Sequence, residues 1–204
     1  GLPAGFEAIM YSISNIIVQV SINNFGVDTM AAWTAYSKID FIFWMINSAF
    51  GISVMTFVGQ NYGAGKWNRI RRGTKICLGM ALISAVSVSI ILMSAERFLF
   101  GIFVNDAGVV EIGIRMMNVI APAYLLFAFI EVFSGALRAQ GAVVVSTLIT
   151  MVGICVLRMI WVTLVAVHGT LEQVIICYPI TWAAGALAMS IYYIYKQRKI
   201  FQAR

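Results

Sequence analysis

Four ionisable side chains lie inside long apolar stretches of this 204-residue sequence: Glu7, Asp40, Glu131 and Arg158. A charged side chain at the centre of a membrane helix costs about 2.5 to 3.5 kcal/mol on insertion scales. Such a charge therefore needs a partner or a water-filled cavity. Because a carboxylate in such a place can bind a cation or take up a proton, these residues are the first candidates for chemistry.

Glu7 and Glu131 are expected at similar depth in the membrane. At about 1.5 Å per residue, they lie about 9 and 10 Å from the inner ends of their helices. Two such carboxylates can share a proton or hold a cation, because like charges in a low dielectric do not both stay ionised unaided. We predict both as ion-coupling residues. The alternative is structural: Glu7 lies at the headgroup boundary, and Glu131 pairs with Arg138 or caps a neighbouring helix.

Asp40 and Arg158 are expected near the outer boundary, about 30 and 26 Å from the inner ends of their helices. Three interpretations stay open: the two residues form a structural ion pair, both are solvated, or Asp40 serves in cation binding or gating. Lys38 could neutralise Asp40 from another helix face, or extend outward with its charge in water. We predict Asp40 as a third ion-coupling candidate and Arg158 as its structural ion-pair partner.

Uncharged polar residues suggest a cavity for a substrate. On the first helix, Tyr11, Asn15 and Gln19 recur every four residues on one face with Glu7. With two asparagines inside other apolar helices, they make up the substrate-cavity candidates: Tyr11, Asn15, Gln19, Asn47 and Asn118. Aromatic faces such as those of Trp33, Trp44 and Tyr124 could hold organic cations, at about 0.5 to 2 kcal/mol each. The alternative is that the amides bond neighbouring helices and the rings only pack.

The elements that position these residues are membrane helices. The chain is 61% hydrophobic and 11% charged, whereas soluble domains are about 45 to 50% apolar and about 25% charged. We predict an all-α, polytopic membrane protein that forms one six-helix bundle over residues 1–204, with a kink at Pro122. The aromatic segment 96–111 lies at the outer surface. The six helices are predicted over residues 3–23, 29–62, 76–95, 112–139, 142–167 and 172–195.

Basic residues indicate the orientation. The segment Val58–Lys75, expected as an inner loop around the Gly63–Gly65 turn, holds five of the fourteen Lys and Arg residues, and four more follow position 195. Clusters of this kind mark the cytoplasmic side, so the C-terminus is expected there. Because topology explains the net charge of +6, no nucleic-acid partner is expected. The chain begins with Gly1 and lacks a basic leader, so we expect the back part of a longer protein.

Enzymatic signatures are missing from the sequence. It has one His and no H-E-x-x-H, G-x-S-x-G or P-loop motif, and its three Cys lack metal or redox spacing. We therefore expect no enzyme, no cofactor and no bound metal. Transport needs only a cavity, a few ionisable groups and two alternative packings.

Several short motifs carry a resemblance to a known family. In chain order they are G-L-P-A-G, S-I-S-N-I-I-V-Q, V-G-Q-N-Y-G-A-G-K, I-A-P-A-Y, E-V-F-S-G-A-L-R-A-Q-G, R-M-I-W and Y-P-I-T-W. This order resembles the C-terminal half of a multidrug and toxic compound extrusion (MATE) transporter over nearly the whole chain. The sequence departs from the family pattern at Ala139, where the family usually has Gly.

The resemblance implies one lobe of a twelve-helix fold whose two six-helix lobes are related by an axis along the membrane normal. It further implies an antiporter of the bacterial cytoplasmic membrane that exchanges Na⁺ or H⁺ for organic cations. The implied partners are small organic cations, membrane lipids and a missing N-terminal six-helix lobe. Two alternatives stay open: a lipid-linked saccharide flippase of the related superfamily, which needs a more cationic cavity, and a non-transporting scaffold, whose polar stripe is satisfied within the bundle.

Overall fold

The computed structural model describes residues 2–165 and 169–202, and these residues form helices and short connections. Six helical stretches are long and apolar enough to cross a membrane, as the sequence predicts. In order, the elements are α1 (Leu2–Asn23), α2 (Val27–Gly63), α3 (Trp67–Ser94), α4 (Glu96–Phe103), α5 (Ala107–Ile120), the 3₁₀ turn η1 (Ala121–Ala123), α6 (Tyr124–Ala139), α7 (Val143–Thr150), the π-helical segment η2 (Met151–Val156), α8 (Leu157–Leu164), α9 (Leu171–Ile175) and α10 (Cys177–Gln202).

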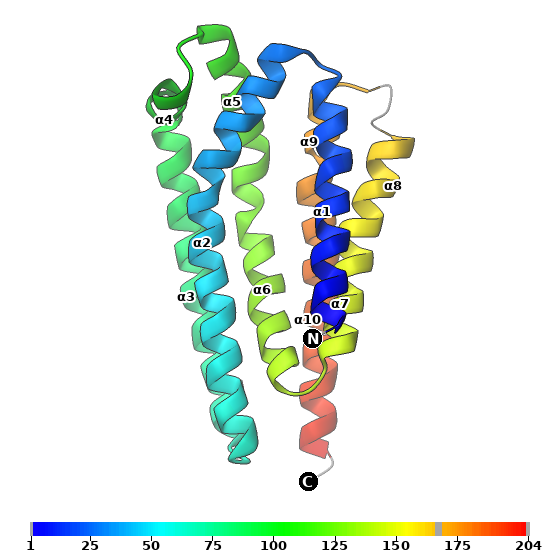
Figure 1. Cartoon of the computed structure of the whole chain (residues 1–204). Coiled ribbons are helices and arrows are strands. Elements are labelled where there is room, and N and C mark those ends of the chain that lie inside the picture. Colours follow the sequence, from blue (N-terminus) through cyan, green and yellow to red (C-terminus); the bar gives the residue numbers. More distant parts are fainter. Residues whose placement is uncertain (1, 166–168, 203–204) are drawn as a thin grey trace.

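The helices form two groups that meet at α6. Helices α2, α3 and the α5–α6 span pack together, whereas α1, the α7–α8 span and α10 form the other group (Figure 1). Helix α6 contacts α2, α3, α7 and α10. The span from Ala107 to Ala139 is accordingly the most buried of the six, with 67% of its most apolar window inside the protein. Side chains on α6 are therefore placed to face cavities between the two groups.

Two helical spans are interrupted where the sequence permits it. Pro122 lies in η1, a 3₁₀ turn between α5 and α6, so the regular α-helix is interrupted at the residue where the sequence predicts a kink. A proline removes one backbone hydrogen bond and disturbs the preceding turn. The fifth span changes to π-helix at Met151–Val156, and no proline accounts for that change. Such segments are rare and often occur at functional sites.

The structure corrects several predicted boundaries. The turn between α2 and α3 is short, with Gly65 at a φ of +66°, so most of the basic residues expected in an inner loop lie in the first turns of α3. The outer segment 96–111 is also largely helical, since α4 occupies its first part and α5 starts at Ala107, where Asp106 caps it. At about 1.5 Å per residue, α2 is about 55 Å long and extends beyond a hydrocarbon layer of about 30 Å.

Candidate functional site

A cavity lined mainly by aromatic side chains lies between α1, α2 and α10. Its volume is about 510 Å³, and we call it the aromatic cavity. Rings enclose it from several directions, and Asp40 is the one acidic residue that lines it. The lining residues are Tyr11, Asn15, Gln19, Trp33, Tyr36, Ser37, Asp40, Phe41, Trp44, Ile120, Tyr178 and Trp182.

Asp40 is held in place by aromatic donors. The Trp44 indole Nε1 donates to Oδ2 at 2.5 Å, and the Tyr124 hydroxyl donates to Oδ1. The Tyr36 hydroxyl lies 3.2 Å from that of Tyr124, so the carboxylate ends a chain of two phenols. Phe43 stacks on the Tyr124 ring with centroids 3.9 Å apart. The carboxylate is therefore oriented by neutral groups while it lines the cavity.

The predicted ion pair between Asp40 and Arg158 is wrong. Among the described residues, the buried Arg158 donates to Asn15 Oδ1 at 3.1 Å, and its guanidinium lies 4.2 Å from the centre of the Tyr178 ring. Its distance to the Tyr11 ring centre is 5.8 Å. Counting residues along a helix gives height and not lateral position, and these two residues lie in different helix groups. Arg158 retains two buried nitrogens, Nε and one Nη, without a hydrogen bond.

Lys38 does not neutralise Asp40 either. Its Nζ lies over the Phe103 ring at 5.4 Å from the centroid, and its side chain is exposed at the end of the bundle. This geometry agrees with the alternative in which Lys38 extends outward. Lys38 therefore leaves the Asp40 carboxyl group available to the aromatic cavity.

A second cavity, of about 260 Å³, lies between α1, α2, α6 and α7 and contains two acidic residues. We call it the acidic cavity. Tyr11 lines both cavities, so it lies between them. The lining residues are Glu7, Tyr11, Gly51, Ile52, Met55, Phe127, Ile130, Glu131, Ser134, Gly135, Arg138 and Thr150.

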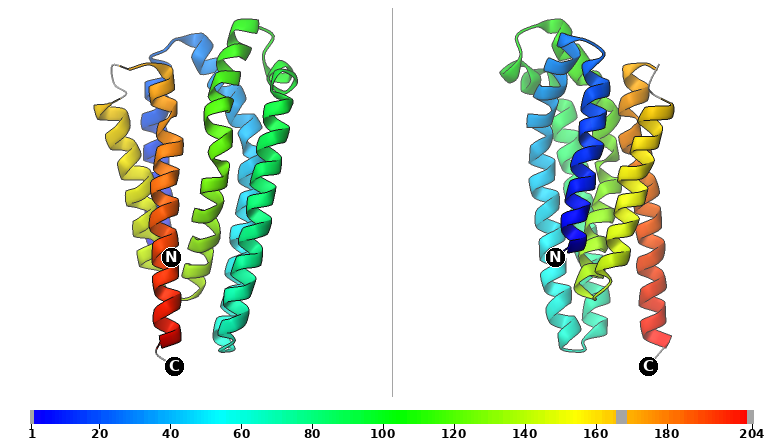
Figure 2. Two further views of the ribbon diagram at one scale, coloured as in Figure 1. Left: turned by 180° about the vertical axis from the view of Figure 1, so that it is seen from behind. Right: turned by 45° about the vertical axis from the view of Figure 1, so that its right-hand side comes forward.

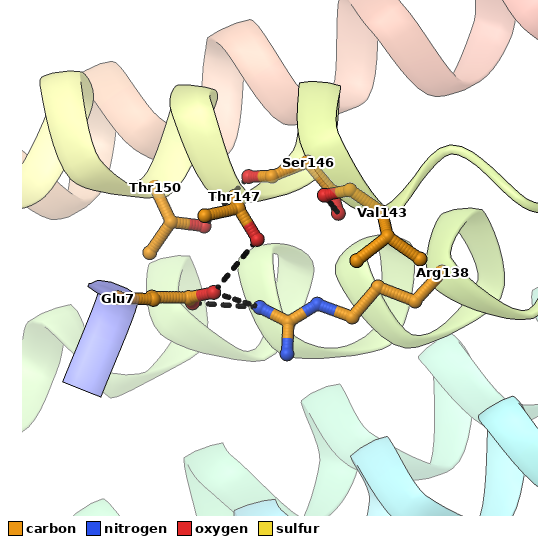
Figure 3. Close-up of polar contacts among 6 residues, drawn as sticks. All are labelled: Glu7, Arg138, Val143, Ser146, Thr147 and Thr150. Atoms are coloured by element: carbon orange, nitrogen blue, oxygen red, sulfur yellow. Dashed lines mark hydrogen bonds and ion pairs between the residues drawn. The ribbon is translucent and has the colours of Figure 1, made fainter. Parts of the chain in front are cut away.

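Glu7 forms an ion pair inside the protein. Arg138 donates from one Nη to both carboxylate oxygens of Glu7 at 2.6 Å, and the Thr147 hydroxyl donates to Oε2 at 3.0 Å (Figure 3). The side chains of Arg138 and Glu7 are 28% and 15% exposed, so the pair is mostly buried. The short ion pair of Arg138 is therefore with Glu7, and its charge also acts on Glu131 in the same cavity, as the predicted alternative has it in part.

Glu131 lines the acidic cavity without a hydrogen bond to any described residue. Its carboxylate lies against the backbone of α2 at Gly51, where a Cβ atom would overlap it. Helices α2 and α6 approach closely here, since a Cβ on Gly135 would come within 2.7 Å of the Gly51 carbonyl oxygen. Gly51 therefore makes room for the carboxylate, and Gly135 permits the close approach of the two helices. The expected similar depth of Glu7 and Glu131 agrees with their shared cavity.

The predicted polar stripe is only partly a cavity lining. Tyr11, Asn15 and Gln19 line the aromatic cavity as expected, with Gln19 also donating to Asn23 at 2.8 Å. Asn47 is buried and lines neither cavity. Asn118 is exposed and also lines neither, so this part of the prediction is wrong. The sequence analysis assigned both asparagines to the cavity because they lie in apolar helices, without evidence for which face of each helix points toward the cavity.

Tyr36, Tyr178 and Trp182 line the aromatic cavity but escaped the sequence analysis. On α2, Tyr36 is spaced by three or four residues from Trp33 and Asp40 and shares their face with Trp44. This spacing was a usable signal, because it puts aromatic rings beside the carboxylate. Tyr178 and Trp182 extend the same wall from α10, and no local signal marks them.

The described residues contain no group of three His, Cys, Asp or Glu side chains that could hold a metal ion. The two cavities instead combine aromatic faces with isolated carboxylates. Faces of Trp and Tyr attract organic cations through the ring quadrupole. A carboxylate without a hydrogen bond can accept a proton or a monovalent cation.

Comparisons with known proteins agree with this architecture. The MatE family model matches residues 3–164 of the chain. "Probable multidrug resistance protein YoeA" of Bacillus subtilis (strain 168) is 24% identical over 205 residues, which cover 98% of this chain and 44% of that protein. The human "Multidrug and toxin extrusion protein 1" is 23% identical, with 74% of this chain and 28% of that protein covered. The chain thus spans less than half the length of these relatives.

Solved structures show the same fold. A crystal structure of MATE in the straight conformation superposes with a TM-score of 0.90 at 15% identity and covers 99% of this chain and 46% of that chain. A MOP superfamily transporter from Pyrococcus furiosus gives a TM-score of 0.87 at 16% identity, with 96% and 44% covered. At these sequence identities the structural similarity shows the fold alone. The family model covers most of the chain, and on that ground the chain belongs to the MatE family.

Proposed function

We propose that the protein containing this chain is an antiporter that exports organic cations across the cytoplasmic membrane, driven by an inward gradient of Na⁺ or H⁺. The chain supplies one six-helix lobe, and a second lobe completes the transporter. Its C-terminus lies in the cytoplasm, because the end of the bundle where α10 stops carries the basic residues of α3 and α10 (Figure 1). The observation that carries the proposal is Glu131, a carboxylate without a hydrogen bond that lines an internal cavity.

The aromatic cavity is the proposed site for the exported cation. Its volume of about 510 Å³ is in the range of small-molecule pockets. Trp33, Trp44 and Tyr178 offer ring faces, and Asp40 supplies one negative charge. Rings recognise charge and shape without directional bonds, which suits a site that accepts varied organic cations.

The acidic cavity is the proposed site for the coupling ion. Arg138 compensates the charge of Glu7, so one carboxylate, that of Glu131, is left for a proton or a sodium ion. Charges inside a membrane protein are expensive unless compensated, so an ion bound at Glu131 favours the conformation that buries it. Tyr11 lines both cavities and is placed to respond to both occupants.

The two alternatives are less well supported. A flippase for lipid-linked saccharides needs cationic groups toward a phosphate, whereas the charges that line the two cavities are three carboxylates and Arg138, which pairs with Glu7. A scaffold needs its intramembrane polar groups satisfied within the bundle, whereas Glu131 has no hydrogen bond to a described residue. Both observations favour transport of a cation.

The test is efflux of a fluorescent organic cation from vesicles that contain the whole protein. An imposed Na⁺ or pH gradient should drive dye movement, and movement that requires only one of them identifies the coupling ion. The variant Glu131→Gln should lose gradient-driven efflux, because an amide neither titrates nor carries charge. The matched control is Glu111→Gln, which removes an exposed carboxylate paired with Arg97 and should keep efflux.

Two results would contradict the proposal. Wild-type vesicles that show no efflux under either gradient would exclude cation-coupled export of the dye. A Glu131→Gln variant with wild-type coupling would remove Glu131 from the mechanism, and the same measurement on Asp40→Asn and Glu7→Gln would then show whether either carries the coupling.

A further inference from the structure

A third cavity lies between α3 and α10, near the ends of these helices that we assign to the cytoplasmic side. Its volume is about 270 Å³. It is separate from the aromatic and acidic cavities and shares no lining residue with them. We call it the basic cavity, and its lining residues are Arg71, Lys75, Tyr193, Ile194, Gln197 and Arg198.

Positive charge dominates the basic cavity. Lys75 enters it from α3 and Arg198 from α10, and neither helix contains an Asp or Glu residue. Arg71 also lines the cavity and has a contact of its own within the chain, so the argument rests on the other two cations. Two converging cations without a carboxylate on either helix favour an anionic ligand.

A buried hydroxyl in the wall gives independent evidence for a ligand. Tyr193 is 7% exposed, and its ring stacks on that of Phe133 with centroids 4.5 Å apart. Its hydroxyl makes no hydrogen bond of standard geometry among the described residues, and the Thr74 side chain lies beside it. Thr74, on the facing helix, already donates its hydroxyl proton to the Ile70 carbonyl at 2.9 Å. A buried donor without an acceptor is costly, so an anion in this cavity would satisfy a group that the protein leaves open.

The neighbouring polar groups have their own partners. Gln197 Nε2 donates to Gln140 Oε1 at 2.9 Å, and Lys196 Nζ donates to the Gln140 carbonyl at 2.9 Å. These bonds tie α10 to the end of α6 and fix one wall of the cavity. The groups left for a ligand are therefore Lys75, Arg198 and the Tyr193 hydroxyl.

The surface beside the cavity distinguishes a lipid from a soluble anion. Counting back from Arg198 by four, three and four residues along α10 gives Ile194, Ile191 and Leu187, which share its face. These three side chains are 49%, 59% and 65% exposed. An apolar stripe that starts at the cation and runs toward the membrane centre matches an acyl chain below a phosphate.

We infer that the basic cavity binds the phosphate of an anionic phospholipid, with Lys75, Arg198 and the Tyr193 hydroxyl as its ligands. This inference goes beyond the proposed antiport. It also stands apart from it, because the cavity contains none of the residues assigned to the exported cation or the coupling ion. A lipid bound here links α3 to α10 across the two helix groups.

The test is native mass spectrometry of the whole protein in detergent, titrated with dioleoyl phosphatidylglycerol. A parallel titration with dioleoyl phosphatidylcholine is the comparison, because it measures binding that needs only the acyl chains and a zwitterionic headgroup. We expect one tight phosphatidylglycerol site that the double variant Lys75→Gln, Arg198→Gln weakens about tenfold or more, because charged hydrogen bonds are lost. Tyr193→Phe should weaken the same site about threefold, because one hydrogen bond to the phosphate disappears.

The matched control is the double variant Arg72→Gln, Lys199→Gln, which removes the same charge from the same two helices outside the cavity. It should leave the tight site within about twofold, since it spares every ligand of the phosphate. Equal loss in both double variants would overturn the site and show only general attraction to anionic lipid. Equal binding of the two lipids would overturn it as well. Competition by inorganic phosphate at similar concentration would show a soluble anion instead and would overturn the assignment to lipid.

Discussion

The absence of a side chain at Gly51 allows the Glu131 carboxylate to lie where the structure places it. The glycine leaves space for the carboxylate against α2, and any Cβ there overlaps it. We predict that Gly51→Ala lowers the stability by about 1 to 3 kcal/mol through overpacking and also lowers efflux. Thermal unfolding of the purified protein and the dye assay measure the two effects.

The control for this prediction is Gly79→Ala, because a Cβ at Gly79 meets nothing within 4 Å. This change inside α3 should be neutral or slightly stabilising, by about 0.5 to 1 kcal/mol. Adding Glu131→Ala to Gly51→Ala should restore stability, since the overlapping group is gone. Unchanged melting of Gly51→Ala would show that the carboxylate has room elsewhere.

We predict that removing one partner of the ion pair between Glu7 and Arg138 lowers the stability more than removing both partners does. Its side chains are 15% and 28% exposed, so removal of one partner leaves a charge that water reaches poorly. We expect Arg138→Gln to cost about 3 kcal/mol, near the low end of the values for buried pairs because of the remaining exposure. Unfolding of the two single variants and of Glu7→Gln, Arg138→Gln together gives the coupling energy. Strict additivity of the two single changes would contradict a direct interaction.

At the scale of helices, the π-helical segment η2 is fixed by its contact with α10. A Cβ on Gly153 would lie 3.3 Å from the Gly185 Cα, so two glycines from different spans are nearly in contact. Close approach of this kind stabilises helix pairs in membranes, where lipid offers no hydrophobic gain. The two spans thereby hold Arg158, two residues after the end of η2, next to Tyr178 of α10.

We predict that Gly153→Val separates η2 from α10 and lowers the stability by about 1 to 3 kcal/mol. The neighbouring Val152 is 59% exposed, so Val152→Leu is a matched control that should melt like the wild type. Tryptophan fluorescence gives a second measurement, because Trp182 lies one turn before Gly185 in the wall of the aromatic cavity. A Gly153→Val protein with unchanged melting and fluorescence would show that the contact does not hold the spans together.

The helices could be predicted from the sequence because apolar length and basic clusters follow directly from the properties of a bilayer. The depth of a side chain in the membrane could also be predicted, since a fixed rise per residue agrees with Glu7 and Glu131 lying in one cavity. The lateral position of a side chain could not be predicted, because it depends on which helix faces pack together. For that reason Arg158 was paired with Asp40 and not with Asn15, and the exposed Asn118 was assigned to a cavity.

At the scale of the whole molecule, charge is divided between the two ends of the bundle. The end with the α2–α3 turn and the last turns of α10 carries basic residues, whereas α4 and α9 lie at the other end (Figure 2). Carboxylates gather at that second end, in part as exposed ion pairs of Arg97 with Glu111 and of Arg115 with Glu172. Such pairs contribute little to stability. Their distribution matters for orientation, because basic residues resist movement across the membrane.

This asymmetry predicts which end of the bundle faces the cytoplasm. The three native cysteines are buried, so a single introduced cysteine can report accessibility without their removal. We expect Ala64→Cys, in the α2–α3 turn, to react with a membrane-impermeant maleimide only after cells are permeabilised, and Asn105→Cys, between α4 and α5, to react in intact cells. The reverse pattern would place the basic cavity on the outer leaflet and would contradict the cytoplasmic location that we propose for the C-terminus. Reaction of wild-type protein would show that a native cysteine opens to water, which the buried positions of Cys77, Cys155 and Cys177 argue against.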